Sequence, residues 1–361
     1  MNHRVVNLTG LATAVAAGWL LAAGCNGTQP APEQHAVTIM TFNVENLFDN
    51  EDDHGKDDRT FLPLAAKQNG EHGAACATIE VERWRDQCLN WDWSDQLLEQ
   101  KLETLARSIL QVGDGRGADI IALQEIENLS ILERLRKDYL ADAGYLPAIL
   151  IDGNDARGID VAFLTRLPQA APAVLHPIEF SGVPDERVAD TRGILEVAFE
   201  LPDGTLLTGY SVHFPAPFHP TKMRVAAYEQ LNRLRADLPA GRHAFAAGDF
   251  NTTSSEDARE NMLERFARPH WTVAHELGCG DDCRGTSYYA RDDSWSFLDM
   301  ILWSPPRRGD NATWAIRADS VQLAKNAPGQ TTKDGTPARF DPDAGAGVSD
   351  HWPLVMTIES K

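Results

Sequence analysis

The stretch "GVSDHWPLV", residues 347–355, lies close to the end of the 361-residue chain. Asp350 and His351 stand side by side in it, directly before an apolar run that is typical of a β-strand. Taken alone, the pair is compatible with an ordinary strand start. Asp350 offers a carboxylate oxygen, and His351 offers a group that exchanges protons near neutral pH. The pair could therefore be part of a catalytic site, if polar residues at the ends of other strands lie beside it.

Apolar, β-rich runs recur along the whole chain and predict its strands. They cover residues 36–44, 118–126, 158–166, 193–201, 205–214, 243–250, 297–304 and 352–359. The turn signal "PDG" joins the fourth run to the fifth, which predicts an antiparallel hairpin. Amphipathic patterns predict helices over residues 94–111, 129–144 and 220–241. Strands of mixed direction with interspersed helices predict an α/β fold of four layers, a sandwich of two packed mixed β-sheets flanked by helices.

The first residues have the layout of an export signal: a basic start, an Ala/Leu/Val-rich core and then small residues. We interpret residues 1–24 as a lipoprotein-type signal peptide, with ordinary cleavage and an uncleaved anchor as the alternatives. "LLAAGC" resembles a lipobox and predicts lipidation of Cys25, although Ala22 stands where Leu is usual. Residues 25–36 then form a polar tether, and residues 37–361 form one domain. The protein is therefore expected to be exported, either as a cell-envelope lipoprotein or secreted.

Four further cysteines, an even number in an exported chain, predict two disulfides. The pairs Cys76–Cys88 and Cys279–Cys283 are the shortest pairing, and the sequence leaves the other two connectivities open. A four-cysteine zinc site is the competing interpretation. Neither pair has the C-x-x-C spacing that such sites use, and an oxidising compartment favours disulfides.

The formal net charge of -20 argues against a high-affinity, nonspecific nucleic-acid binder that holds polyanions mainly by charge. It is compatible with an enzyme that binds a phosphodiester briefly through a metal ion. Residues 49–58, "DNEDDHGKDD", suggest a calcium loop, but His54 stands where Gly is needed and Thr60 where Glu is needed. The run therefore predicts an exposed acidic loop, with a weak cation site as the alternative.

Polar side chains follow or interrupt many of the predicted strands. They are Asn43, Glu125, His213, Asp249, Asn251, Asp299, Asp350 and His351. Most have an ordinary explanation as turn formers or solvated strand ends, but Asp299 interrupts an apolar run and needs a partner such as His351 or a metal. Together they combine hard oxygen ligands, which suit Mg²⁺, Mn²⁺ or Ca²⁺ rather than zinc, with two proton-exchanging histidines. That combination is what hydrolysis of a phosphodiester by activated water requires.

The ordered set "FNVENLF", "LQEIEN", "VHFPAP", "GDFN", "FLDMIL" and "SDHWPLV" resembles the endonuclease/exonuclease/phosphatase superfamily. This superfamily includes pancreatic deoxyribonuclease, abasic-site endonucleases, bacterial extracellular nucleases, sphingomyelinases and inositol polyphosphate phosphatases. The matches run from residue 37 to residue 356, so they cover the whole domain. The resemblance implies a deoxyribonuclease I-like fold and catalysis with Mg²⁺, with Mn²⁺ or Ca²⁺ as alternatives. We expect a monomer.

By this resemblance, Asn43, Glu125 and Asp350 bind the catalytic metal, with Glu125 as the principal ligand. Asp249 matches the residue that orients or deprotonates the attacking water, and Asn251 the residue that holds the phosphate or the metal.

The remaining matched residues concern the histidines and the phosphate. His351 matches the residue that contacts the scissile phosphate, and Asp299 the one that orients that imidazole. His213 matches a second histidine of the deoxyribonuclease-like branch, with Asp160 as its candidate partner. Arg192 matches an arginine that contacts phosphate, and a surface salt bridge is its alternative role.

The resulting hypothesis is a lipid-anchored, metal-dependent nuclease that cleaves DNA or RNA outside the cytoplasm. One alternative keeps the chemistry and changes the substrate to a phospholipid headgroup, an inositol phosphate or another small phosphate ester. Another is a binding protein with an inactive site. Residues 49–96, with three tryptophans and a predicted disulfide, form an insertion between two motifs that either shapes substrate choice or caps the sheet edge.

Overall fold

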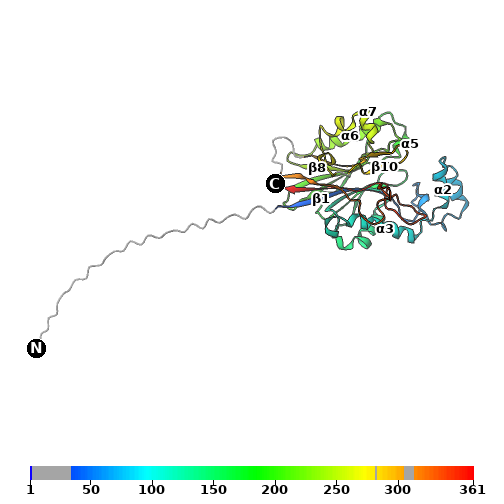
Figure 1. Ribbon diagram of the computed structural model, residues 1–361, viewed down its shortest axis with the longest axis horizontal. Coiled ribbons are helices and arrows are strands. Elements are labelled where there is room, and N and C mark those ends of the chain that lie inside the picture. Colours follow the sequence, from blue (N-terminus) through cyan, green and yellow to red (C-terminus); the bar gives the residue numbers. More distant parts are fainter. Residues whose placement is uncertain (2–33, 281–282, 305–312) are drawn as a thin grey trace. The chain divides into compact units, whose positions relative to one another are not determined.

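Two six-stranded β-sheets lie at the centre of the fold (Figure 1). The computed structural model describes Met1 and residues 34–280, 283–304 and 313–361. The predicted signal peptide, the lipidation site Cys25 and the tether as far as residue 33 lie outside these residues. Within the part of the chain that is described, no helix is both long and apolar enough to cross a membrane.

The first sheet has the strand order β13-β14-β1-β2-β4-β3, and the second has the order β5-β6-β7-β8-β12-β9. The strands of the first sheet are β13 (Trp314–Leu323), β14 (Leu354–Ser360), β1 (Ala36–Leu47), β2 (Ile120–Ile126), β4 (Asp160–Thr165) and β3 (Ile149–Leu150). Those of the second are β5 (Val174–His176), β6 (Ile194–Glu200), β7 (Leu206–His213), β8 (His243–Asp249), β12 (Asp299–Ser304) and β9 (Thr272–Val273). A separate hairpin pairs β10 (Ser287–Tyr289) with β11 (Ser294–Ser296).

Each sheet contains one parallel pair at its centre, β1 with β2 and β7 with β8, and antiparallel pairs elsewhere. The predicted mixed sheets and the antiparallel hairpin of β6 and β7 are thus confirmed. Every predicted apolar run contains a strand, because the central strands are buried on both faces and so carry near-continuous apolar sequence.

The helices are α1 (Gly70–Cys76), α2 (Glu82–Asn90), α3 (Asp95–Leu110), α4 (Leu129–Arg134), α5 (Asp185–Val188), α6 (Thr221–Ala236) and α7 (Ser254–Glu260). Helix α3 packs on the outer face of the first sheet and α6 on that of the second. Helices α1 and α2 belong to the insertion, residues 49–96. Short turns of helix occupy η1 (Arg59–Phe61), η2 (Gly113–Gly115), η3 (Leu135–Tyr139), η4 (Ala141–Ala143), η5 (Leu263–Ala267) and η6 (Ala274–Leu277). Helix α3 lies on one side of the paired sheets, and α6 and α7 lie on the other (Figure 1).

Three apolar layers hold this arrangement together. Ile39 packs between the sheets, whereas its neighbour Met40 packs against α3 on the opposite face of the same strand. On the outer face of the second sheet, Val212 and Ala246 pack against Tyr228 of α6. The four-layer sandwich predicted from the sequence is therefore the observed fold.

The helix predicted over residues 129–144 is interrupted. Helix α4 ends at Arg134, and a π-helical turn over Leu135–Tyr139 follows, in which the Leu140 N–H donates to the Leu135 carbonyl. The wider turn lets both Leu135 and Leu140 reach the core below α3. Gly144, with a φ of 76°, ends the segment where the sequence predicted.

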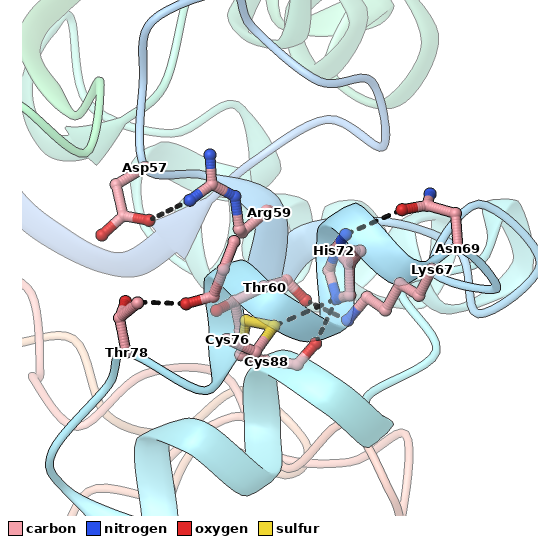
Figure 2. The surroundings of a disulfide bond; sticks show 10 residues. Asp57, Arg59, Thr60, Lys67, Asn69, His72, Cys76, Thr78 and Cys88 are labelled. Atoms are coloured by element: carbon pink, nitrogen blue, oxygen red, sulfur yellow. Dashed lines mark hydrogen bonds and ion pairs between the residues drawn. A yellow bond between two sulfur atoms is a disulfide. The ribbon is translucent and has the colours of Figure 1, made fainter.

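The insertion, residues 49–96, carries a disulfide between Cys76 of α1 and Cys88 of α2. Figure 2 shows His72 beside it, with Nε2 2.9 Å from the Cys88 carbonyl oxygen and 3.2 Å from the Cys76 sulfur. A second disulfide joins Cys279 to Cys283. The predicted pairing is thus confirmed, and the four-cysteine zinc site is wrong because all four thiols are used in disulfides.

The insertion is only partly exposed. Trp93 is buried and its indole N–H donates to the Phe48 carbonyl, whereas Trp84 is 58% exposed. Within residues 49–58, Asp58 is only 1% exposed, so the prediction of a fully exposed acidic loop is wrong at this residue. Its side chain is turned inward, where it accepts a hydrogen bond from the Asp53 N–H.

Gly248 fixes the approach of β8 to β7 next to the polar end of both strands. Its φ is 156°, and a Cβ at this position would overlap the carbonyl group of Val212. The obstacle is backbone and cannot swing aside, so we expect Gly248→Ala to lower the free energy of unfolding by about 1–3 kcal/mol or more. Urea denaturation measures this difference.

Gly73→Ala in α1 is the matched control, because a Cβ there meets nothing within 4 Å. Its effect should stay within about 1 kcal/mol and favour folding, since alanine is the better helix former. Equal urea midpoints for Gly248→Ala and the wild type would contradict the steric argument.

Candidate active site

The polar ends of the central strands from both sheets meet at one place. In the second sheet, His213 at the end of β7 and Asp299 at the start of β12 are both register partners of Asp249. In the first sheet, Asn43 and Glu125 lie near the ends of the parallel strands β1 and β2. Strand β14 runs antiparallel to β1, so His351, just before β14, lies at this same end.

Asn43 links the two sheets through its side chain. Its Nδ2 donates to Glu125 Oε1 at 3.2 Å and to Asp249 Oδ2 at 3.1 Å. Its Oδ1 accepts a hydrogen bond from the Glu45 N–H at 3.0 Å. The amide thereby holds one carboxylate of each sheet in a fixed position.

His351 and Asp299 form a buried pair. His351 Nδ1 lies 2.6 Å from Asp299 Oδ2, and both side chains are at least nine-tenths buried. Burial alone would lower the pKa of His351, but the carboxylates of Asp299, Asp350 and Asp249 raise it well above its usual value. The contact predicted between residues about fifty positions apart is confirmed, and it favours an imidazolium with Nε2 free of Asp299.

Ser349 connects this pair to the first sheet. Its hydroxyl donates to the Asn43 carbonyl at 2.7 Å and accepts from the His351 N–H at 3.0 Å. The backbone around His351 is therefore tied to the same residue that positions Glu125 and Asp249.

Asp249 is buried between groups of both signs. Burial raises its pKa to about 7; His351 acts to lower it, and Asp299 acts to raise it. The Asn251 N–H donates to Asp249 Oδ1 at 2.8 Å, while the Asn251 amide donates to the Phe214 carbonyl at 2.9 Å. The carboxyl group is thus able to gain or lose a proton near neutral pH.

His213 is buried beside the same carboxylates. Its Nε2 lies 3.6 Å from Asp249 Oδ2 and 4.0 Å from Glu125 Oε1, and burial lowers its pKa well below the usual value. The predicted partner Asp160 instead accepts from the Gly153 N–H at 3.1 Å. The pairing with Asp160 is therefore wrong, because the start of β4 turns that carboxylate toward a neighbouring loop.

Arg192 is buried, with 4% of its surface exposed. Its Nε lies 3.2 Å from Asp155 Oδ2 in an ion pair whose two side chains are almost fully covered. Arg192 therefore forms a salt bridge, but a buried one and not the surface salt bridge given as its alternative role. The predicted phosphate contact stays a prediction.

Sequence reasoning missed a second group of charged residues next to Asp350. Glu45 Oε2 accepts from the backbone N–H groups of Phe340 and Asp350, each at 3.0 Å, and Glu45 Oε1 lies 2.7 Å from Arg339 Nε. Arg339 also pairs with the Asp350 carboxylate. Burial, followed by the charge of Asp350, raises the pKa of Glu45 to about 8.

Lys101 is the third missed residue. Its Nζ donates to the carbonyls of Val44 and Val348, both at 2.7 Å, and burial lowers its pKa to about 8. A lysine among the leucines on the apolar stripe of α3 was a usable signal for this position. Arg339 had no such signal.

Several non-glycine residues here adopt left-handed backbone conformations. The φ angles are 54° for Glu45, 57° for Asn46, 65° for Glu125 and 50° for Asn251. Such conformations cost free energy and persist only where surrounding contacts enforce them. One such contact is the hydrogen bond from the Asn46 N–H to Glu125 Oε2 at 2.9 Å. The backbone is held so that these side chains converge.

The donor set at this site fits a divalent cation that prefers oxygen. Glu125, Asp350 and Asn43 supply carboxylate and amide oxygens, and sulfur donors are absent from the described residues that meet here. Asp249, Asp299 and His351 also place ligand-type atoms within 4.8 Å of one another. In this structure Asp350 is engaged by Arg339, so its role as a ligand stays a prediction.

Two packed sheets, with histidines and carboxylates gathered at the ends of their central strands, define a deoxyribonuclease I-like α/β sandwich. A sequence profile of the Endonuclease/Exonuclease/phosphatase family matches residues 40–351. The chain belongs to this family, and it is a hydrolase of phosphoester bonds. A search of curated protein sequences finds no match.

Solved structures share the fold at low sequence identity. Humanized D. rerio TDP2 is similar with a TM-score of 0.53 and 15% identity, over 90% of this chain and 98% of that chain. A Bacteroides vulgatus family protein reaches 0.52 and 16%, over 91% and 100%. D. rerio TDP2 in complex with a single-strand DNA product reaches 0.50 and 15%, over 90% and 98%.

The His351–Asp299 contact gives a direct prediction. We expect Asp299→Asn to lower the pKa of His351, because it removes the negative charge next to Nδ1. An NMR titration of the imidazole in the metal-free protein measures this pKa. The stability that the ionised pair contributes should be fully present below about pH 6.5 and be lost as the pH rises through the folded pKa of His351.

Ser349→Ala is the control for this experiment. It removes a hydroxyl that contacts the His351 backbone and leaves the Asp299 carboxylate in place. The pKa of His351 should stay high in this variant. An unchanged pKa in Asp299→Asn would show that Asp299 does not set the charge of the imidazole.

Proposed function

We propose that the protein is a divalent-metal-dependent nuclease that cleaves DNA or RNA strands outside the cytoplasm. The observation that carries the nucleic-acid substrate is a groove beside Asp350, with a volume of about 1500 Å³. Among its lining residues are the exposed arginines Arg83, Arg259, Arg284, Arg291 and Arg339, together with the aromatic residues Phe218, Tyr288, Tyr289 and Trp295.

The charge of this groove differs from that of the whole protein. Arg83, Arg284 and Arg291 make no ion pair with any described residue, although the chain carries a net charge of -20. Five acidic residues also line the groove, so its charge is mixed: Glu256, Asp292, Asp293, Asp334 and Asp350. Arginines that track phosphates, interleaved with rings that stack on bases, are the features that single-stranded nucleic acid requires.

The β10–β11 hairpin joins the groove to the catalytic residues. Ser287 of β10 lines the groove and forms an isolated β-bridge with His351. A nucleic-acid strand bound along the groove would therefore reach the His351 imidazole.

The arrangement supports an in-line attack of water on phosphorus, in which the bond from phosphorus to the leaving oxygen breaks as the bond to the water oxygen forms. The leaving oxygen then takes a proton from solvent. Asp249, with its pKa near 7, accepts the proton of the attacking water. His351, kept protonated by Asp299, donates from Nε2 to a nonbridging phosphate oxygen as negative charge grows there. His213 stays neutral and orients the water or the phosphate beside Asp249.

Glu125 and Asn43 would hold the cation. When bound, it would neutralise charge on the phosphate oxygens. Asn43 contributes in its own right, because its hydrogen bonds hold Glu125 and Asp249 at a fixed separation across the two sheets.

Two observations support the wider proposal. A structural relative with the same fold, D. rerio TDP2, binds a single-strand DNA product, and this favours nucleic acid over a small phosphate ester. The two disulfides favour an oxidising compartment, in line with the proposed export signal and the lipid anchor at Cys25.

Glu125→Gln and His351→Gln test the catalytic site. We expect each to reduce the rate of hydrolysis by about 10²–10⁴-fold, because one removes a metal ligand and the other the group that stabilises charge on the phosphate. The rates are measured on plasmid DNA, single-stranded RNA, sphingomyelin vesicles and bis-p-nitrophenyl phosphate with Mg²⁺, Mn²⁺ or Ca²⁺. Far-UV circular dichroism checks that the variants fold.

The substrates separate the competing functions. Preferred turnover of sphingomyelin would replace the nuclease by a lipid phosphodiesterase. Failure to hydrolyse any of the four substrates with any of the three ions, together with failure to bind an ion, would favour a binding protein. Full activity in either variant would refute the proposed roles of the two residues.

The groove gives a separate prediction on binding. In the Glu125→Gln protein, Arg284→Ala and Arg291→Ala should weaken binding of single-stranded oligonucleotides of every sequence. Each should also reduce the slope of log affinity against log salt by about 0.7, since one phosphate contact is lost. Fluorescence anisotropy at several salt concentrations measures both.

Arg317→Ala is the matched control, because Arg317 is an exposed arginine of β13 that does not line the groove. Its removal changes the net charge equally and should leave the slope unchanged. The same loss in all three variants would mean that overall charge, rather than the groove, governs binding.

A further inference from the structure

Three carboxylates outside the active site meet where the insertion begins. Asp53 and Asp58 lie in the loop of residues 49–58, and Glu127 lies directly after the end of β2. One oxygen of each comes within 4.8 Å of the other two. Residues that are about seventy positions apart in the sequence thus form one acidic cluster.

Two of these carboxylates are buried and incompletely paired. Asp58 is 1% exposed and Glu127 is 2% exposed. Asp58 Oδ2 accepts from the Asp53 N–H at 2.7 Å, and Glu127 Oε2 accepts from the Asp49 N–H at 2.6 Å. Asp58 Oδ1 and Glu127 Oε1 are buried without a hydrogen-bond partner among the described residues. A buried carboxylate oxygen that lacks a partner is costly, and native proteins usually supply one.

The basic side chains of the loop point elsewhere. Lys56 Nζ donates to the carbonyls of Asp155 at 3.0 Å and Gly153 at 3.4 Å. Arg59 pairs with Asp57 at 3.6 Å. Within the described chain, no lysine or arginine forms an ion pair with any of the three clustered carboxylates. The described residues therefore provide no ion-pair partner for these carboxylates.

We propose that Asp53, Asp58 and Glu127 hold a second divalent cation, of the calcium type, separate from the catalytic metal. All three donors are carboxylate oxygens, which suit Ca²⁺ and do not suit zinc. Asp53 is solvent-accessible, so water can complete the six to eight ligands that Ca²⁺ takes. The loop does not have the spacing of a one-segment calcium loop, and Glu127, directly after β2, supplies the third carboxylate.

The cation ties the insertion to the central sheet. The Asp49 N–H already donates to Glu127, and Asn128 Nδ2 reaches Asp49 Oδ2 at 3.0 Å, so the start of the loop lies against the end of β2. The same insertion carries Arg83, which lines the arginine groove. Occupancy of the site therefore stabilises the start of the insertion against the end of β2.

Calorimetric titration with CaCl₂ and thermal unfolding test the site on the full chain with the Glu125→Gln substitution. Asp58→Asn added to this protein should remove one bound Ca²⁺ per chain, or weaken its binding by about tenfold or more, and abolish the increase in Tm that Ca²⁺ causes. The loss is expected whatever the active site binds, so the result does not depend on the proposed function.

Asp52→Asn is the matched control, because it makes the same charge change in the same loop and lies outside the cluster. Its Ca²⁺ binding should stay within about twofold of the parent protein, as expected for an exposed charge that is screened by salt. If Asp58→Asn does not fold, Asp53→Asn at the solvent-accessible member must show the loss instead. Equal weakening by Asp52→Asn and by the cluster variants, or no binding to the parent protein, would overturn the proposal.

Discussion

The concentration of buried and partly buried carboxylates at one end of the sandwich constrains the rest of the site. These are Glu45, Glu125, Asp249, Asp299 and Asp350. Each needs a donor or a positive charge, and the structure provides a different one in each place: the Asn43 amide between Glu125 and Asp249, the His351 imidazole at Asp299, and Arg339 between Glu45 and Asp350. The two histidines differ in charge. The carboxylates of Asp299, Asp350 and Asp249 raise the pKa of His351, so it holds its proton. Burial, followed by the charge of Arg192, lowers the pKa of His213, which stays neutral although it lies beside Asp249 and Glu125.

The sheets and most of the polar cluster could be predicted because their signals are local. A strand buried on both faces shows as an apolar run, and a polar residue at its end shows as an interruption. Once the central strands pair, such residues lie together at one end of the sandwich. Their meeting can therefore be predicted from the strand pattern alone. The break in the helix over residues 129–144 could not be predicted, since it depends on where Leu140 meets the core and not on any helix-breaking residue. The position of Asp58 depends in the same way on a distant segment, because its carboxylate lies close to that of Glu127.

Charge partners were the least predictable part of the site. Arg339 reaches Glu45 across almost three hundred residues, and nothing in its own neighbourhood in the sequence indicates this. Asp160 shows the opposite error: its position at a strand start resembles that of the true site residues, but its carboxylate turns to Gly153. Strand ends therefore identify which residues can meet, while side-chain direction decides which of them do. Only for Asp299 did the sequence suggest the partner, because an acid inside an apolar run requires one.

The insertion contains two members of the acidic cluster and an arginine that lines the groove. Its first loop places carboxylates against the end of β2, two residues beyond Glu125, and its helix α2 places Arg83 at the groove. An anionic substrate would be repelled by the former and attracted by the latter. The fold keeps the two apart. Asp58 and Glu127 are buried, whereas Arg83 is exposed. The net charge of the chain thus says little about the potential that a substrate meets, because burial and local pairing, rather than composition, decide which charges face the groove.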